Sequence, residues 1–306
     1  MRTLLMAAVL LSQIASVQTP ASEPAAAEQT ISVNASLVNV LFTVSDSKGR
    51  FVTSLPKDKF KVYEDNKIQS ITQFSNETDL PLSIAILIDT SGSIGDKLPF
   101  ERQAAIEFLR STLRRGKDKA LLITFDTGID LVQDYTDDVS VLAQAAEKIR
   151  AGGSTAMYDA IHLAATEKLA AQTGRHIEIL ISDGNDTSSR KTLDEALRSA
   201  RQSDTAIYCI STNSILKNSS RDTANGTKVL RRFAEETGGR IFTPRTTDEL
   251  ASTFKEIDEE LRSQYALAYH PNSTRRDGAF HTIRVETSNK ELRVKARNGY
   301  FDAPQF

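Results

Sequence analysis

The sequence has a single cysteine, Cys209, and only four histidines among its 306 residues. One cysteine excludes an intramolecular disulfide, and its place in the apolar run 206–210 predicts a buried core residue. The chain also lacks an excess of either charge, because 38 basic and 40 acidic side chains leave a formal net charge of -2. This balance gives no indication of a nucleic-acid partner or of a membrane-surface partner.

The sequence also lacks an apolar run of the roughly 20 residues that a membrane-spanning helix requires. A shorter apolar stretch over residues 4–11, extended less purely to Val17, follows Arg2 and is typical of a secretory signal peptide. We therefore expect a signal peptide over residues 1–20, without a defined cleavage site, and a flexible lead-in over 21–30. This predicts a secreted or periplasmic protein, with membrane anchoring through an uncleaved segment as the less favoured alternative.

Strands and helices alternate through the middle of the chain. Continuous apolar runs at 84–88, 120–125 and 177–181 are typical of parallel strands that are covered on both faces. The alternation predicts an α/β fold with a doubly wound, mostly parallel sheet over residues 80–262. The last helix is expected to begin with a capping pattern at Thr247. Helices are expected at 98–113, 139–149, 157–171, 193–202, 228–236 and 247–262. Two further strands are expected at 205–210 and 240–242.

The two flanking segments, 31–78 and 263–306, show the period-two alternation of β-strands. Phe60 and Val62 alternate with charged residues, and the polar run 64–66 predicts a hairpin turn. Each segment is too short to bury a core alone. We therefore predict that the two segments pair into one small β-sandwich-like satellite, which the α/β domain interrupts.

Side chains that carry oxygen atoms lie in three loops of the predicted α/β region. Asp89, Ser91 and Ser93 alternate in the loop after the first buried strand, Thr155 ends a glycine-rich loop, and Asp183 follows another apolar strand. Ligands bind doubly wound sheets outside the carboxyl ends of the strands, near the point where strand order reverses. An all-oxygen set without histidine or thiolate suits a hard cation such as Mg2+, with Mn2+ or Ca2+ as possible substitutes.

This pattern resembles the metal-ion-dependent adhesion site (MIDAS) of von Willebrand factor A (VWFA) domains, which implies a Rossmann-like VWFA fold. The resemblance implies that Ser91 and Ser93 bind the ion through their hydroxyls and that Thr155 joins directly or through water. It implies that Asp89 and Asp183 act mainly through water. An ion held in this way keeps a coordination position for an Asp or Glu carboxylate of a partner protein.

Three shorter stretches resemble a bacterial secreted VWFA-related subfamily. These stretches are residues 60–65, 158–160 and 297–300. Three further aspartates near the oxygen-rich loops are interpreted as structural: Asp126 as a strand-end residue, Asp159 as a helix-start residue and Asp186 as a loop charge.

The residues and the resemblance predict a non-enzymatic, extracytoplasmic module for protein binding or cell adhesion. Two alternatives remain open: a metal-dependent hydrolase that uses the same ion as a Lewis acid, and a structural envelope protein whose metal stabilises the fold. A hydrolase is less favoured because Ser91 lacks the Gly-x-Ser-x-Gly elbow and a histidine placed as its base. Phosphatases that use an aspartate such as Asp89 need a second carboxylate two residues later, where Ser91 stands. No catalytic residue, organic cofactor or small-molecule substrate is expected.

Overall fold

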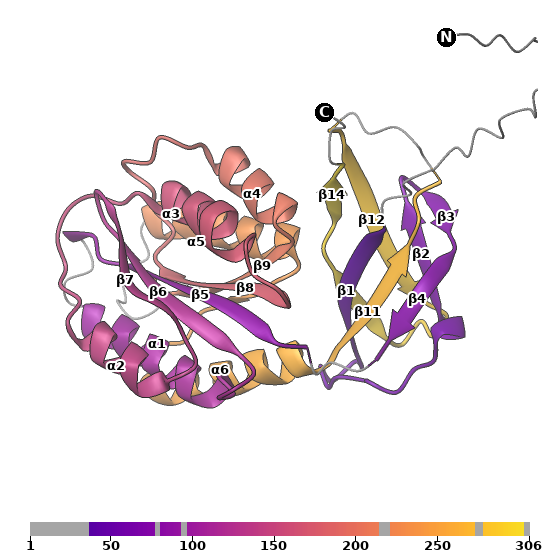
Figure 1. Cartoon of the computed structure of the whole chain (residues 1–306), viewed down its shortest axis with the longest axis horizontal. Helices are drawn as coiled ribbons and strands as arrows, with labels where there is room; N and C mark the ends of the chain where they lie inside the picture. The colour runs from indigo at the N-terminus through magenta and orange to yellow at the C-terminus, as the bar shows by residue number, and fades with distance from the viewer. Residues whose placement is uncertain (1–36, 77–79, 93–96, 214–220, 273–277, 303–306) are drawn as a thin grey trace, which may run out of the picture. The chain divides into compact units, whose positions relative to one another are not determined.

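The middle of the chain forms a six-stranded sheet with the strand order β10-β9-β8-β5-β6-β7 (Figure 1). The first five of these strands are parallel, and β7 pairs antiparallel with β6 at one edge. The computed structural model describes residues 37–76, 80–92, 97–213, 221–272 and 278–302. The strand bounds are β5 (Leu82–Asp89), β6 (Lys119–Phe125), β7 (Ile129–Thr136), β8 (Arg175–Ser182), β9 (Thr205–Ser211) and β10 (Ile241–Phe242).

Helices cover both faces of this sheet, as the continuous apolar runs predict (Figure 1). Every residue of β5 is buried, and its side chains divide between two cores by period-two alternation. Ile86 packs in the core beneath one helical layer, and Leu87 packs in the core beneath the other. One layer holds α1 (Leu98–Thr112), α2 (Val139–Glu147) and α6 (Thr247–Arg262). The other holds α3 (Met157–Leu163), the π-helix Ala164–Leu169, α4 (Leu193–Gln202) and α5 (Arg221–Thr237).

Strand order reverses at β5, which lies between β6 and β8. The chain passes from β5 to β6 on one side and later reaches β8 on the other side. The carboxyl ends of β5 and β8 therefore lie next to each other, with Asp89 at the end of one strand and Ser182 at the end of the other. In doubly wound folds this is the position where ligands bind.

The N-terminal and C-terminal segments pair in two antiparallel four-stranded sheets, in agreement with the predicted satellite. One sheet has the order β13-β1-β11-β4 and the other has the order β14-β12-β2-β3, so both segments contribute strands to each sheet. A shared core joins the sheets: Phe42 from the first sheet contacts Phe60 from the second with ring centroids 5.0 Å apart. The strand bounds are β1 (Val38–Ser45), β2 (Phe60–Glu64), β3 (Lys67–Gln69), β4 (Ile71–Ser75), β11 (Gln264–Tyr269), β12 (Phe280–Thr287), β13 (Arg293–Ala296) and β14 (Gly299–Phe301).

Several details differ from the sequence-based expectations. Helix α5 begins at Arg221, seven residues before the helix expected over 228–236, because its first two turns carry few apolar residues to mark them. Strand β7 was not expected, because polar residues interrupt its partly exposed apolar ones. The N-cap of α6 is Thr246 and not Thr247: the Thr246 hydroxyl accepts from the backbone N–H of Glu249, an acidic residue at the third helical position. The helix expected over 157–171 divides into α3 and a π-helix, since i→i+5 bonding has no clear sequence signature.

Glu178 lies in the middle of β8 with both carboxylate oxygens buried and without a hydrogen-bond partner among the described residues. Burial raises its pKa well above the usual value. Folding therefore favours the protonated form, so the contribution of this group is complete below about pH 4.5 and declines as pH rises. We expect Glu178→Met to raise the free energy of unfolding by about 1–3 kcal/mol near neutral pH, with a smaller gain near pH 4.5. Urea unfolding at both pH values measures this difference, and a variant less stable than the natural chain at neutral pH would contradict it.

Candidate metal centre

Asp89 ends strand β5 and its carboxylate is buried. One oxygen, Oδ1, accepts a hydrogen bond from the Ser91 backbone N–H at 3.0 Å, and Oδ2 accepts one from the Ser182 hydroxyl at 2.8 Å. These bonds order the loop after β5 and join it to the end of β8. Burial and the charge of Asp183 raise the pKa of Asp89 to about 6, against the lowering effect of its hydrogen bonds.

Asp183 follows β8, and its side chain is 13% exposed. Its Oδ1 accepts from the Asn185 backbone N–H at 3.0 Å, which leaves Oδ2 on the side of Lys97, 3.9 Å from the ammonium nitrogen. The loop then turns at Gly184, where φ is +83° and a Cβ atom would lie 2.3 Å from the Gly226 carbonyl oxygen. A larger residue cannot occupy this position without moving the loop, because both the backbone conformation and the space favour glycine.

Thr155 lies in the loop that precedes α3 and is buried. Its backbone N–H donates to the Thr187 hydroxyl, and its carbonyl accepts from the Thr187 and Ser188 backbone N–H groups. On the other side, the Gly92 N–H donates to the Gly153 carbonyl at 2.9 Å. Hydrogen bonds therefore connect the Thr155 loop both to the loop after Asp89 and to the loop after Asp183.

Four of the five expected ligands lie in the described part of the chain, on three loops that hydrogen bonds join at the carboxyl edge of the sheet. These four are Asp89, Ser91, Thr155 and Asp183. The fifth, Ser93, lies outside the described residues.

Two charged residues near these loops were not expected from the sequence. Lys97, the N-cap of α1, is 6% exposed and its ammonium faces Asp183. Glu101, in the first turn of α1, is fully buried. Their positions in an amphipathic helix pattern gave no reason to separate them from ordinary surface charges, and only the close approach of α1 to the ends of the strands reveals them.

The three neighbouring aspartates have structural partners. Asp126 accepts from the Gly128 N–H within its own loop. Asp159 was expected to order the start of its helix, but its two oxygens accept from the backbone of residues 190 and 191. The start of α3 is instead bonded by Asp186, whose Oδ1 accepts from the Tyr158 N–H at 3.2 Å.

The donor set fits a hard divalent cation. The described donors are carboxylate and hydroxyl oxygens, which suit Mg2+, Mn2+ or Ca2+ better than softer metals. A cation would also offset the cost of burying Asp89 close to Asp183, a cost that is visible in the raised pKa of Asp89.

Glu64, Asp65 and His281 form another group whose potential ligand atoms lie within 4.8 Å of one another in the described part of the chain. Their polar atoms already have protein partners. His281 Nδ1 lies 2.8 Å from Asp65 Oδ2, and the hydroxyls of Tyr269 and Tyr300 donate to Glu64 Oε2. These contacts account for the cluster as a hydrogen-bonded link between β2, β12 and the neighbouring strands.

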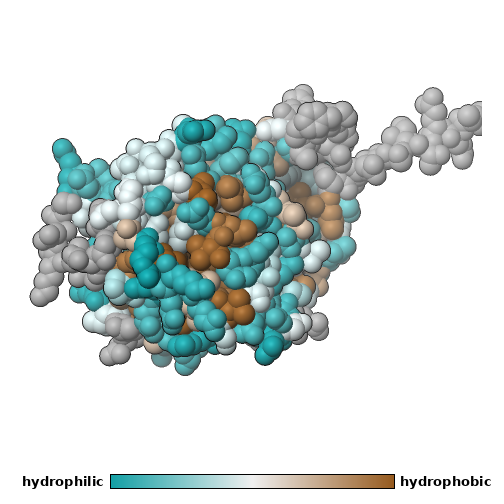
Figure 2. Space-filling model, turned by 60° about the vertical axis from the view of Figure 1, so that its left-hand side comes forward, coloured by the Kyte–Doolittle hydropathy of each residue, from teal (hydrophilic) through white to brown (hydrophobic). Residues whose placement is uncertain are grey.

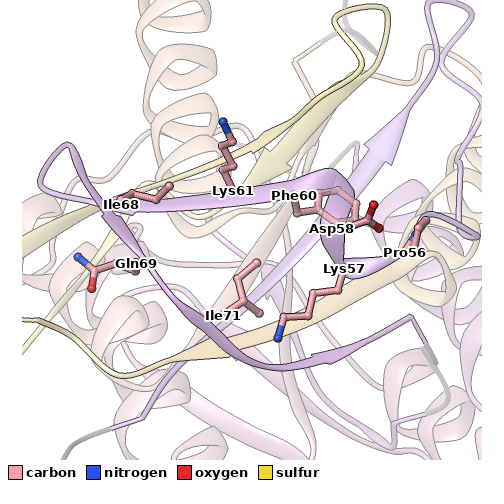
Figure 3. Close-up of a pocket in the computed structure, with 8 residues that line it drawn as sticks. All are labelled: Pro56, Lys57, Asp58, Phe60, Lys61, Ile68, Gln69 and Ile71. Atoms are coloured by element: carbon pink, nitrogen blue, oxygen red, sulfur yellow. The ribbon is translucent and has the colours of Figure 1, made fainter.

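A pocket of about 500 Å³ lies in the β-sandwich, beside the β2–β3 hairpin and the start of β4 (Figure 3). Its lining combines apolar side chains with two lysines, Lys57 and Lys61, and one carboxylate, Asp58. Two positive charges against one negative charge do not favour a divalent cation there. The loops at the ends of β5 and β8 remain the better candidate.

The sequence matches the model of the von Willebrand factor type A domain over residues 83–256, more than half of the chain. The chain therefore belongs to the von Willebrand factor type A (VWA) domain family, whose members are commonly protein-interaction modules. The sequence has no significant match among curated proteins.

The solved structures to which this chain is similar are distant in sequence. A von Willebrand factor type A protein from Catenulispora acidiphila is 13% identical, with a TM-score of 0.50 over 89% of this chain and 74% of that one. An aerotolerance-related membrane protein from Bacteroides fragilis is 18% identical, with a TM-score of 0.46 over 60% of this chain and 98% of that one. At these identities the likeness concerns the fold alone.

Proposed function

We propose that this VWA domain is an extracytoplasmic protein-binding or adhesion module that holds a divalent cation, Mg2+ in the first instance, and recognises a carboxylate of a partner protein. The observation that carries the proposal is the joining of three oxygen-bearing loops at the point where strand order reverses. The bound ion supplies a positive centre with a coordination position that an outside Asp or Glu can take. The five residues that would hold it are Asp89, Ser91, Ser93, Thr155 and Asp183.

The residues of the chain have separate roles in this proposal. Ser91 and Ser93 offer hydroxyl oxygens, with Thr155 from the neighbouring loop. Asp89 positions the Ser91 backbone through Oδ1 and the end of β8 through Oδ2, so its carboxylate also fixes the loops. Hydrogen bonds of this kind strengthen a metal centre because they hold the ligand loops in place before the ion binds.

On the face that Figure 2 presents, hydrophilic side chains lie between and around the hydrophobic areas. The exposed large apolar residues of the described chain belong to different elements and connections: Leu37, Ile68, Leu80, Leu131 and Val141.

Among the described residues no helix is long and apolar enough to span a membrane.

A pull-down from the envelope and medium of the producing cell tests the proposal. We expect the chain to capture a protein partner in Mg2+ and to lose it in excess chelator, with Ser91→Ala as the control that fails to capture it even in Mg2+. Capture that persists in chelator would contradict carboxylate recognition through the ion and would favour a structural envelope protein. Metal-dependent turnover of phosphatase, esterase or peptidase substrates would favour a hydrolase instead.

A further inference from the structure

Glu101 is the least expected side chain near the proposed metal centre. It lies in the first turn of α1 and its side chain is 0% exposed. The Thr212 hydroxyl is close enough to act on the carboxylate, but neither carboxylate oxygen makes a regular hydrogen bond among the described residues. Taking a carboxylate out of water without a partner is costly. The surrounding helical positions that face the core are apolar, as at Ala105 and Phe108, so an apolar residue would suit the same face at no such cost.

The charged groups around Glu101 are those of the metal centre. The carboxylates of Asp89 and Asp183 act electrostatically on Glu101, and so does the ammonium of Lys97. Burial and the two carboxylates raise the pKa of Glu101 well above its usual value, although Lys97 opposes them. The backbone places Glu101 at the same edge of the sheet: its N–H donates to the carbonyl of Lys97, whose ammonium faces Asp183. Thr212, whose hydroxyl acts on the Glu101 carboxylate, donates its backbone N–H to the Ser182 carbonyl at the end of β8.

Among the described residues, the formal charges of this group do not balance. Asp89, Glu101 and Asp183 carry three formal negative charges when ionised, and Lys97 supplies one positive charge. Lys97 Nζ lies 3.9 Å from Asp183 Oδ2, which is longer than a direct hydrogen bond. Ionising all three carboxylates would leave two formal negative charges in a buried environment, where electrostatic interactions are stronger than in water. The raised pKa values of Glu101 and Asp89 express this cost, which a bound cation would offset.

We propose that Glu101 is a further carboxylate of the cation centre, which strengthens divalent-ion binding by supplying negative charge that Lys97 leaves uncompensated. The inference rests on the proposed function, since it presupposes that the centre binds a divalent ion. Glu101 acts through its charge and its burial behind the ligand loops, and the loops themselves supply the ligands. Neutralising it removes attraction for the ion without removing a hydrogen bond of the ligand loops, because the Glu101 carboxylate makes no regular hydrogen bond to these loops among the described residues.

Calorimetric titration of the full chain with Mg2+ near pH 8 tests the inference with Glu101→Gln, which keeps the shape and removes the charge. We expect the Mg2+ dissociation constant to rise by about tenfold or more, the size that charged groups outside the ligand shell commonly contribute. Glu178→Gln is the matched control: Glu178 is equally buried and equally unpartnered, yet no charge of the metal centre acts on it. Its Mg2+ affinity is expected to equal that of the natural chain.

Thermal unfolding distinguishes a role in ion binding from a structural role. Both glutamine variants are expected to unfold at a higher temperature than the natural chain in chelator, because each removes a buried ionisable group. Only Glu101→Gln is expected to lose most of the further rise that Mg2+ produces. Glu101→Asp keeps the charge and is expected to bind Mg2+ more tightly than Glu101→Gln.

The outcomes separate this inference from the proposed function. If the natural chain binds Mg2+ and Glu101→Gln binds it equally well, the inference is wrong and the proposed function stands. If Glu101→Asp binds as weakly as Glu101→Gln, shape and not charge is responsible, which also overturns the inference. If the natural chain binds no divalent ion, the proposed function itself fails.

Discussion

Replacing Asp89 with alanine is expected to weaken Mg2+ binding about 100-fold, measured by calorimetric titration of the full chain. The substitution removes a buried carboxylate and the two hydrogen bonds that it accepts, from the Ser91 backbone N–H and from the Ser182 hydroxyl. Both effects act on the ion, because the charge attracts it and the bonds hold the β5 loop against the end of β8.

Asp126 provides the matched control for this prediction. It follows β6, the neighbouring strand, and its carboxylate bonds the Gly128 N–H of its own loop. Asp126→Ala is expected to change the Mg2+ dissociation constant by less than about threefold, because the half-buried Asp126 carboxylate bonds within its own loop and is not one of the proposed ligands. Equal loss of affinity in both variants would indicate a general effect of negative charge and would contradict a specific role for Asp89.

Replacing Asp118 with alanine is expected to lower the free energy of unfolding by about 3–5 kcal/mol, as the loss of one partner from a buried ion pair does. The Asp118 side chain is fully buried and pairs with Arg114 at 2.8 Å and with Arg262 at 2.9 Å. It also accepts from the Leu82 backbone N–H at 2.9 Å. One carboxylate thus joins the start of β5, the end of α1 and the end of α6.

The same network predicts a pH dependence. Burial would raise the pKa of Asp118, but hydrogen bonds from Arg114 and Leu82 and the charge of Arg262 lower it to about 2. A lowered folded-state pKa means that this contribution is present above about pH 3.8 and is lost as pH falls toward 2. Urea unfolding at neutral pH and near pH 2 is therefore expected to show a smaller effect of Asp118→Ala in acid.

Asp258 offers a control on the same arginine. It lies 3.4 Å from Arg262 and its side chain is 32% exposed, so the pair is weaker and partly screened by water. Asp258→Ala is expected to cost less than about 1 kcal/mol. If Asp118→Ala costs no more than Asp258→Ala, the network does not stabilise the domain as described.

The sequence was most informative where a segment is buried on both faces. Strands β5, β6 and β8 were expected as continuous apolar runs, and the structure confirms each within a few residues. Strand β7 was missed because it lies at the sheet edge, pairs antiparallel with β6 and has irregular register. An edge strand buries fewer apolar side chains, so apolar residues recur less regularly in its sequence.

The candidate metal centre was predictable only in part. Residue types and their order along alternating strands and helices placed Asp89, Thr155 and Asp183 at one end of the sheet. Lys97 and Glu101 escaped notice because helical periodicity cannot distinguish a charge that faces solvent from one that faces the end of a neighbouring strand. That distinction depends on how α1 packs, which is a property of the tertiary structure and not of the local sequence.

The most direct test of the metal centre is a crystal structure of the chain soaked in Mn2+, with an anomalous-difference map. We expect a single strong peak between the loops of Ser91, Thr155 and Asp183, bound by oxygen atoms alone. A peak at Glu64, Asp65 and His281 instead, or an ordered site between these three loops without a peak, would contradict the central claim.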